Sequence, residues 1–138
     1  VADTTQNIPH PYPDGAAELW LGGGHTPAAG EAIAESLGRL PARRTYLIVG
    51  MLNTKDVRGF LRPLAPVAES LHAITIPGEK NTLTADQTLA AALDTGHRAV
   101  AAAGVSASVR EIAAADPAAR ILICGSLYLA GQVLRENG

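Results

Sequence analysis

The 138-residue sequence contains one cysteine, one tryptophan, one phenylalanine and one methionine, and it has no long apolar run. A single cysteine cannot form an intramolecular disulfide, which excludes a disulfide-stabilised scaffold and favours a reducing cytoplasm. Cys124 lies in the apolar run 121–124, so we expect a small buried thiol. No segment approaches the roughly 20 apolar residues of a membrane span, and the first residues lack the pattern of a signal peptide. We therefore expect a cytoplasmic protein without a membrane partner.

The sequence has 11 Lys and Arg and 13 Asp and Glu, so neither sign of charge is in large excess and the net charge is −2. Such a chain lacks the basic surface with which proteins bind nucleic acid. The four histidines and the cysteine have no metal-ligand spacing, so we expect no metal site. Hydrophobic residues make up 47% of the chain and aromatic residues only 4%. This composition predicts one core filled by small aliphatic side chains.

Short apolar runs alternate with helical patterns after a proline-rich start. Residues 1–15 include Pro9, Pro11 and Pro13, and we interpret them as a linker or tail that precedes one domain, residues 16–138. Alternating strands and helices are typical of a parallel sheet covered on both faces. We therefore predict an α/β, Rossmann-like fold with a mostly parallel sheet of about five or six strands. The expected strands are 18–21, 46–49, 73–76, 99–103 and 120–124.

Capping residues predict where the helices begin and end. Thr26 and Pro27 suit the start of a helix that carries Ala29, Ile33, Leu37 and Leu40 on one face. A second helix is expected to begin at Asp56, with an interruption near Pro63 and Pro66. A third begins at Thr84, which forms a capping box with Gln87, and ends at Gly96. Two further helices are expected from Ser106 to Asp116 and from after Ser126 through Leu134.

Three loops follow predicted strands, and in an open parallel sheet ligands bind beyond the carboxyl ends of the strands. The glycine-rich loop 22–27 suits close approach of an anion, or is a tight turn with a surface His25. The loop 50–56 either brings together the hydrogen-bond donors of Asn53 and Lys55, or is only a helix cap with a solvated lysine. Ser126 either binds an anion at a helix start or caps that helix. No Gly-Lys pair of a Walker A loop and no GxSxG motif occurs.

Three motifs together resemble a known family. They are LWLGGGHTPAAG at 19–30, VGMLNTKD at 49–56 and ICGSLYLAG at 123–131. In this order and spacing they look like the C-terminal domain of bacterial folylpolyglutamate synthase / dihydrofolate synthase, a member of the Mur ligase superfamily. The resemblance covers residues 16–138 and implies a Rossmann-like domain hinged to a central P-loop ATPase domain, whose phosphate loop is absent from this sequence.

The resemblance implies an ATP-dependent amide ligase. In such an enzyme, ATP phosphorylates the carboxylate of a folate or dihydropteroate, and the amine of L-glutamate then displaces the phosphate. Its cofactors are ATP and Mg, and the central domain of the same parent chain, which is also the implied partner of this one, holds most of the Mg ligands. Residues 1–138 should therefore be folded but inactive alone, and we expect no catalytic residue among them.

The resemblance also assigns roles to single residues. It places ATP at Gly22, Gly23, His25 and Thr26, and glutamate at His25 and Ser126. The resemblance assigns Asn53, Lys55 and Asp56 to positioning at the domain interface. The family usually has Asp where Gly22 stands and Asn where Thr26 stands, so Gly22 removes a carboxylate that would contact the nucleotide.

A second hypothesis follows from Gly22 and from the missing phosphate loop. The chain would then be a stand-alone nucleotide- or anion-binding regulatory module without catalysis. A third, a receiver-like interaction domain, is disfavoured because the sequence lacks the clustered acidic residues of a phospho-acceptor site with magnesium.

Overall fold

Six strands form one sheet in the computed structural model, which describes residues 5–8, 17–53 and 56–125. The order across the sheet is β1-β2-β6-β3-β4-β5. Strands β2 to β6 pair in parallel, and β1 is an antiparallel edge strand. Their bounds are Thr5–Ile8 (β1), Glu18–Gly22 (β2), Thr45–Val49 (β3), Ser70–Ala73 (β4), Ala99–Ala101 (β5) and Arg120–Cys124 (β6).

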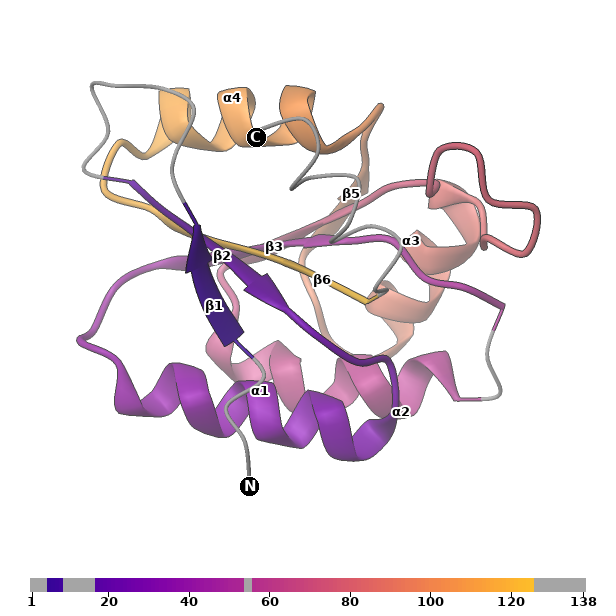
Figure 1. Cartoon of the computed structure of the whole chain (residues 1–138), viewed down its shortest axis with the longest axis horizontal. Coiled ribbons are helices and arrows are strands. Elements are labelled where there is room, and N and C mark those ends of the chain that lie inside the picture. Colours follow the sequence, from indigo (N-terminus) through magenta and orange to yellow (C-terminus); the bar gives the residue numbers. More distant parts are fainter. Residues whose placement is uncertain (1–4, 9–16, 54–55, 126–138) are drawn as a thin grey trace.

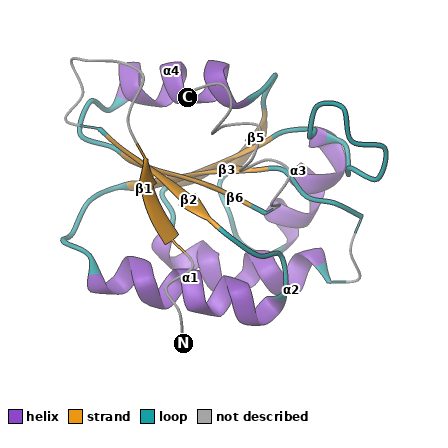
Figure 2. Ribbon diagram, viewed as in Figure 1, coloured by secondary structure: helices purple, strands orange, loops and turns teal. Residues whose placement is uncertain are grey.

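Helices cover both faces of this sheet, which confirms the predicted Rossmann-like α/β fold (Figure 1). Of the helices that the structure describes, α4 lies on one face, and α1 and α2 lie on the other, as the three layers of Figure 2 show. The bounds are Pro27–Arg39 (α1), Val57–Leu61 (α2), Ala85–Asp94 (α3) and Val105–Ala115 (α4), with a 3₁₀ helix η1 at Arg62–Val67. No helix among the described residues is long and apolar enough to cross a membrane.

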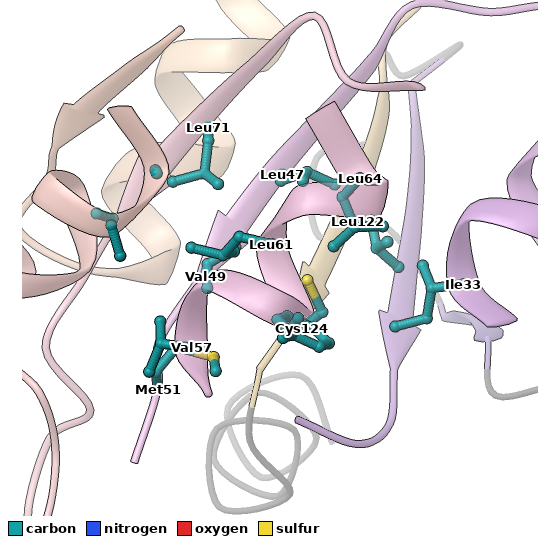
Figure 3. Close-up of a cluster of buried hydrophobic side chains, with 14 of the residues drawn as sticks. Ile33, Leu47, Val49, Met51, Val57, Leu61, Leu64, Leu71, Leu122 and Cys124 are labelled. Carbon is teal, nitrogen blue, oxygen red and sulfur yellow. The ribbon is translucent and has the colours of Figure 1, made fainter. Parts of the chain in front are cut away.

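The alternation of side chains along the strands divides the core into two layers. Leu47, Val49, Leu122 and Cys124 pack with Ile33 and the helices of the α1 face (Figure 3). The intervening strand residues pack toward α4; this second cluster contains Leu19, Leu21, Ile48, Ile121, Ile123, Val109 and Ile112. Small aliphatic residues thus fill both layers, as the composition predicts.

The predicted caps are confirmed at three helices. Thr26 accepts a hydrogen bond from the Ala29 amide at the start of α1, and Asp56 accepts one from Gly59 at the start of α2. Thr84 and Gln87 form the expected capping box of α3. The break near Pro63 and Pro66 is the 3₁₀ helix η1. The helix predicted after Ser126 lies outside the described residues.

Three other expectations are wrong. Strand β4 is Ser70–Ala73 and not 73–76, because the amide of Ile76 turns away from the sheet to the hydroxyl of Thr82. The cap of α4 is Gly104, without a side-chain cap bond, and Ser106 lies in the first turn. Part of the predicted linker 1–15 is strand β1, since residues 5–8 pair with β2. The predicted strand 99–103 is confirmed in shorter form as β5.

Two buried histidines lie beside this core. His97 has its Nε2 2.8 Å from the carbonyl oxygen of Leu61, so Nε2 is the donor, and its buried Nδ1 has no partner among the described residues. Burial lowers the pKa of His97, against the raising effect of that hydrogen bond. Burial likewise lowers the pKa of His72 on β4. Both side chains are therefore neutral at neutral pH.

The histidine environment predicts acid sensitivity. As the pH falls below about 6.5, the unfolded chain takes up protons that the folded chain excludes, so the free energy of unfolding decreases by at most about 1.4 kcal/mol per pH unit for each histidine. His97→Gln keeps a donor for Leu61 without titrating. We expect this variant to lose a smaller part of its stability between pH 7.5 and 5.5 than the parent chain, measured by urea unfolding. The exposed His25→Gln is the control, and an equal effect of both variants would contradict the assignment.

Candidate functional site

The carboxyl ends of β2, β6 and β3 lie side by side, and the three predicted loops leave from them. The Gly50 amide donates to the carbonyl of Cys124 at 3.3 Å. Gly125 has φ +108°, and a Cβ there would lie 2.5 Å from the oxygen of Gly50. Only glycine fits this close approach of two backbones. The beginnings of the three loops are therefore fixed together at one edge, although Ser126 lies outside the described residues.

The glycine loop is a sharp turn between β2 and α1. Gly24 has φ +91°, and a Cβ there would lie 2.7 Å from that of Ala29. The turn exposes His25 and Thr26 at the sheet edge. The oxygen of Thr26 is already used as the cap of α1, 3.1 Å from the Ala29 amide, but its hydroxyl proton remains available as a donor. The cap interpretation is thus confirmed, and it is compatible with a ligand.

Gly22, the last residue of β2, is buried between the sheet and α1. A Cβ at this position would lie 3.2 Å from Cδ1 of Ile33, 3.3 Å from Cβ of Cys124 and 3.4 Å from Cδ1 of Leu122. These neighbours belong to the apolar cluster of Figure 3. A side chain at residue 22 therefore starts in the core, and a carboxylate there begins among apolar atoms.

The loop after β3 is held by a second loop. The amide of Asn53 donates to the carbonyl of Asn81 at 2.7 Å, and Leu52 forms an isolated antiparallel bridge with Thr82. Asn53 itself is exposed, and Asp56 caps α2 with a 2.8 Å bond from Gly59. The cap interpretation of Asp56 is confirmed. Lys55 lies outside the described residues.

Sequence reasoning missed the segment 74–84 that follows β4. Thr82 fixes it: its hydroxyl accepts from the Ile76 amide at 3.0 Å and donates to the Leu83 carbonyl at 2.8 Å. This places the exposed Lys80 and Asn81 at the same sheet edge as Asn53. This segment also follows a parallel strand, but the apolar pattern predicts that strand at 73–76, three residues after its actual position.

The described residues of the edge offer binding groups and no strong nucleophile. Burial raises the pKa of the Cys124 thiol to about 12, so this thiol stays protonated at neutral pH. An anion at this edge would be stabilised by the amides of the glycine loop, by His25 and by Lys80. No group of three His, Cys, Asp or Glu side chains that would hold a metal occurs within residues 5–8, 17–53 and 56–125. The described groups of this edge therefore suit an anion.

A family of known proteins matches most of the chain. Its description is "Mur ligase, glutamate ligase domain", and the match covers residues 14–127. A search of curated proteins gave no significant match.

Several solved structures have a similar fold. Folylpolyglutamate synthase of Mycobacterium tuberculosis, complexed with ADP and AMPPCP, superposes with a TM-score of 0.75 at 28% identity, over 88% of this chain and 30% of that one. E. coli FolC in complex with ADP gives 0.70 at 26%, again over 88% and 30%. Ligand-free folylpolyglutamate synthase/dihydrofolate synthase of Yersinia pestis gives 0.76 at 20%, over 96% and 30%, and indicates the fold alone. The chain thus spans about 30% of the length of these solved chains.

The surroundings of Gly22 predict the effect of restoring an acidic residue. We expect Gly22→Asp to lower the free energy of unfolding by about 1–3 kcal/mol relative to Gly22→Ala, because both variants add a Cβ but only Asp adds an unpaired carboxylate among apolar groups. Urea unfolding of the two variants measures the difference. Equal stability would mean that the carboxylate leaves the core and reaches the loop surface.

Proposed function

Because the chain belongs to the Mur ligase family, whose glutamate ligase domain it matches over residues 14–127, we propose that it is the C-terminal domain of an ATP-dependent folate ligase. The enzyme would add L-glutamate to dihydropteroate or folate through an acyl phosphate. The observation that carries the proposal is this family match, together with the convergence of the matching motifs at one sheet edge. In this proposal the domain contains residues 16–138 and also strand β1, which pairs with β2 in the same sheet.

The identities of the similar structures support the use of ATP. The M. tuberculosis and E. coli proteins, at 28% and 26% identity, are complexes with ADP, and the first also contains AMPPCP. In the proposed enzyme Gly22, Gly23, His25 and Thr26 face the nucleotide. The exposure of His25 and Thr26 and the positive φ of Gly24 support this placement. The buried Gly22 would contribute only its backbone.

Glutamate would lie between the glycine loop and the residues after β6. We assign His25 and Ser126 to its recognition, and Asn53, Lys55 and Asp56 to positioning at the domain interface. The end of strand β6 supports this arrangement, because Gly125 lies against the backbone of Gly50, where the loop after β3 begins. Lys80 adds a cation at the same edge that suits a second carboxylate.

The phosphate loop and the Mg²⁺ ligands would come from a central P-loop ATPase domain of the parent chain. Phosphoryl transfer depends on positioned cations and a phosphate-binding loop. The sequence contains no Gly-Lys pair of a Walker A loop, and its described residues contain no metal-binding cluster. The carboxyl edge would close on that domain and complete the site.

The division of labour between domains predicts that the isolated chain is inactive. Residues 1–138 should release no phosphate above a buffer control when mixed with ATP, Mg²⁺, L-glutamate and dihydropteroate, because the sequence has no Walker A loop to hold the transferred phosphoryl group. The control is the full-length product of the parent gene, which should release ADP only when glutamate is present. Turnover by the isolated chain would refute the division. A full-length protein that binds ATP without glutamate-dependent turnover would favour a nucleotide- or anion-binding regulatory module.

Substitutions of Ser126 distinguish a role in ligand binding from a role in helix capping. A cap alone predicts that Ser126→Ala costs about 1 kcal/mol of stability and Ser126→Gly only a few tenths, with unchanged kinetics. Glutamate recognition predicts that both variants of the full-length enzyme raise KM for glutamate and leave KM for ATP nearly unchanged. We expect the second result in steady-state assays. A parent-like glutamate KM in a folded Ser126→Gly enzyme would end the assignment.

A further inference from the structure

The two loops that follow β3 and β4 pair with each other beyond the sheet and form a short antiparallel ribbon. We define the ribbon as residues 51–53 and 81–83, which lie at the right of Figure 1. At its outer end, the amide of Asn53 donates to the carbonyl of Asn81 at 2.7 Å. Both of these residues are exposed. The ribbon therefore carries polar side chains beyond the sheet, on the side of the candidate site.

The inner end of the ribbon is anchored in the core. The amide of Leu83 donates to the carbonyl of Met51 at 2.8 Å. Met51 is fully buried, and Leu83 packs against the apolar cluster to which Met51 belongs (Figure 3). Burial of these side chains holds the inner end in place, whereas the exposed outer end depends on hydrogen bonds.

The hydroxyl of Thr82 connects the ribbon to the point where the chain leaves β4. Thr82 lies in the middle of the ribbon, where it forms the antiparallel bridge with Leu52. Its hydroxyl accepts a hydrogen bond from the amide of Ile76 at 3.0 Å and donates one to the carbonyl of Leu83 at 2.8 Å. One side chain thus serves two backbone groups, and a hydrocarbon side chain of the same shape would leave both without this partner.

Thr75 allows a direct comparison within the same segment. Its hydroxyl accepts a hydrogen bond from the amide of Ala85 at 2.9 Å, at the start of α3. This bond has the same kind of donor and acceptor as the bond from Ile76 to Thr82, and nearly the same length. Thr75, however, belongs to neither strand of the ribbon. The two threonines therefore distinguish the general cost of a lost hydroxyl from an effect on the ribbon.

An ordered outer end is useful for a residue that meets another domain. A surface loop that becomes ordered only when its partner arrives loses conformational freedom at that moment, and this loss weakens the contact. A displacement of a contacting residue by about 1 Å also lowers the rate of a reaction that depends on the closed geometry. Asn53 is exposed, and the ribbon fixes its backbone in the absence of any partner. Its position is therefore preorganised.

We propose that Thr82 is a positioning residue of the ligase and holds Asn53 in place for closure of the carboxyl edge on the central domain. The inference rests on the proposed function, in which Asn53 lies at the domain interface. In this role Thr82 acts through the backbone of the ribbon and not through a contact with substrate or nucleotide. A variant that keeps the fold but loses the hydroxyl should therefore impair closure and leave the binding of both ligands unchanged.

Hydrogen exchange of the ¹⁵N-labelled 138-residue chain tests the structural step. Thr82→Val keeps the β-branched shape and removes the hydroxyl, so the amide of Asn53 should exchange about fivefold faster. Thr82→Ser should exchange within about twofold of the parent rate. Thr75→Val is the matched control and should change the exchange of Asn53 less than about twofold. Acceleration that is equal in the two valine variants, or that extends equally to the amides of β6, would overturn the proposal.

Steady-state kinetics of the full-length enzyme test the functional step, with ATP, L-glutamate and dihydropteroate as substrates. Thr82→Val should lower kcat per folded enzyme by at least about threefold, because closure follows binding. KM for ATP and KM for glutamate should stay within about twofold of the parent values. Thr82→Ser should restore kcat, and Thr75→Val should keep it.

A double variant tests whether Thr82 acts through Asn53. Asn53→Ala should lower kcat, and the addition of Thr82→Val should lower it further by less than about twofold. Multiplicative effects, or a parent-like kcat of Thr82→Val in an active full-length enzyme, would overturn the role of Thr82 and leave the proposed function intact. A full-length enzyme without glutamate-dependent turnover would overturn the proposed function itself, and the kinetic role of Thr82 with it.

Discussion

The central position of β6 is the constraint on which the rest of the structure depends. This strand is the last of the six in sequence, yet it pairs with both β2 and β3, and all five of its residues are buried. Leu122 and Cys124 face the layer of α1, whereas Ile121 and Ile123 face α4. A shift of one residue would exchange the two faces, so packing on both sides fixes the register. That register places Gly125 at one edge of the sheet and Arg120 at the other.

At the carboxyl edge, space rather than charge determines the architecture. Gly125 admits the backbone of Gly50, and Gly24 turns the chain into α1 with a positive φ. The described edge presents amides and exposed polar side chains on a rigid frame, while its one thiol is buried and protonated. The described part of this frame suits the binding and orientation of a ligand. Membership of the Mur ligase family fits such a design, because in the proposed enzyme the chemistry is shared with another domain.

The sequence predicted those parts of the fold whose signals are local. Strands β2, β3 and β6 contain the apolar runs 19–21, 46–49 and 121–124, and Thr26, Asp56 and Thr84 are side-chain caps. Strand β4 was misplaced because the buried His72 reads as polar, while Ile74 and Ile76 continue the apolar pattern beyond the strand. Strand β1, with the sequence Thr-Gln-Asn-Ile, carries no strand signal of its own and depends on its partner β2. The candidate loops were predicted, but their contacts with Asn81 and Thr82 are long-range and have no pattern in the sequence.

The burial of Arg120, at the opposite edge of the sheet, also depends on long-range contacts that the sequence pattern does not show. An arginine before an apolar run is typical of a strand that begins at the surface, but pairing with both neighbours buries it, and Glu18, at its register position on β2, supplies the counter-charge. The strand cannot slide by one residue to relieve this burial without exchanging its two buried faces. The bond from Arg120 to Glu18 therefore belongs to the same register that places Gly125 beside Gly50 at the other edge.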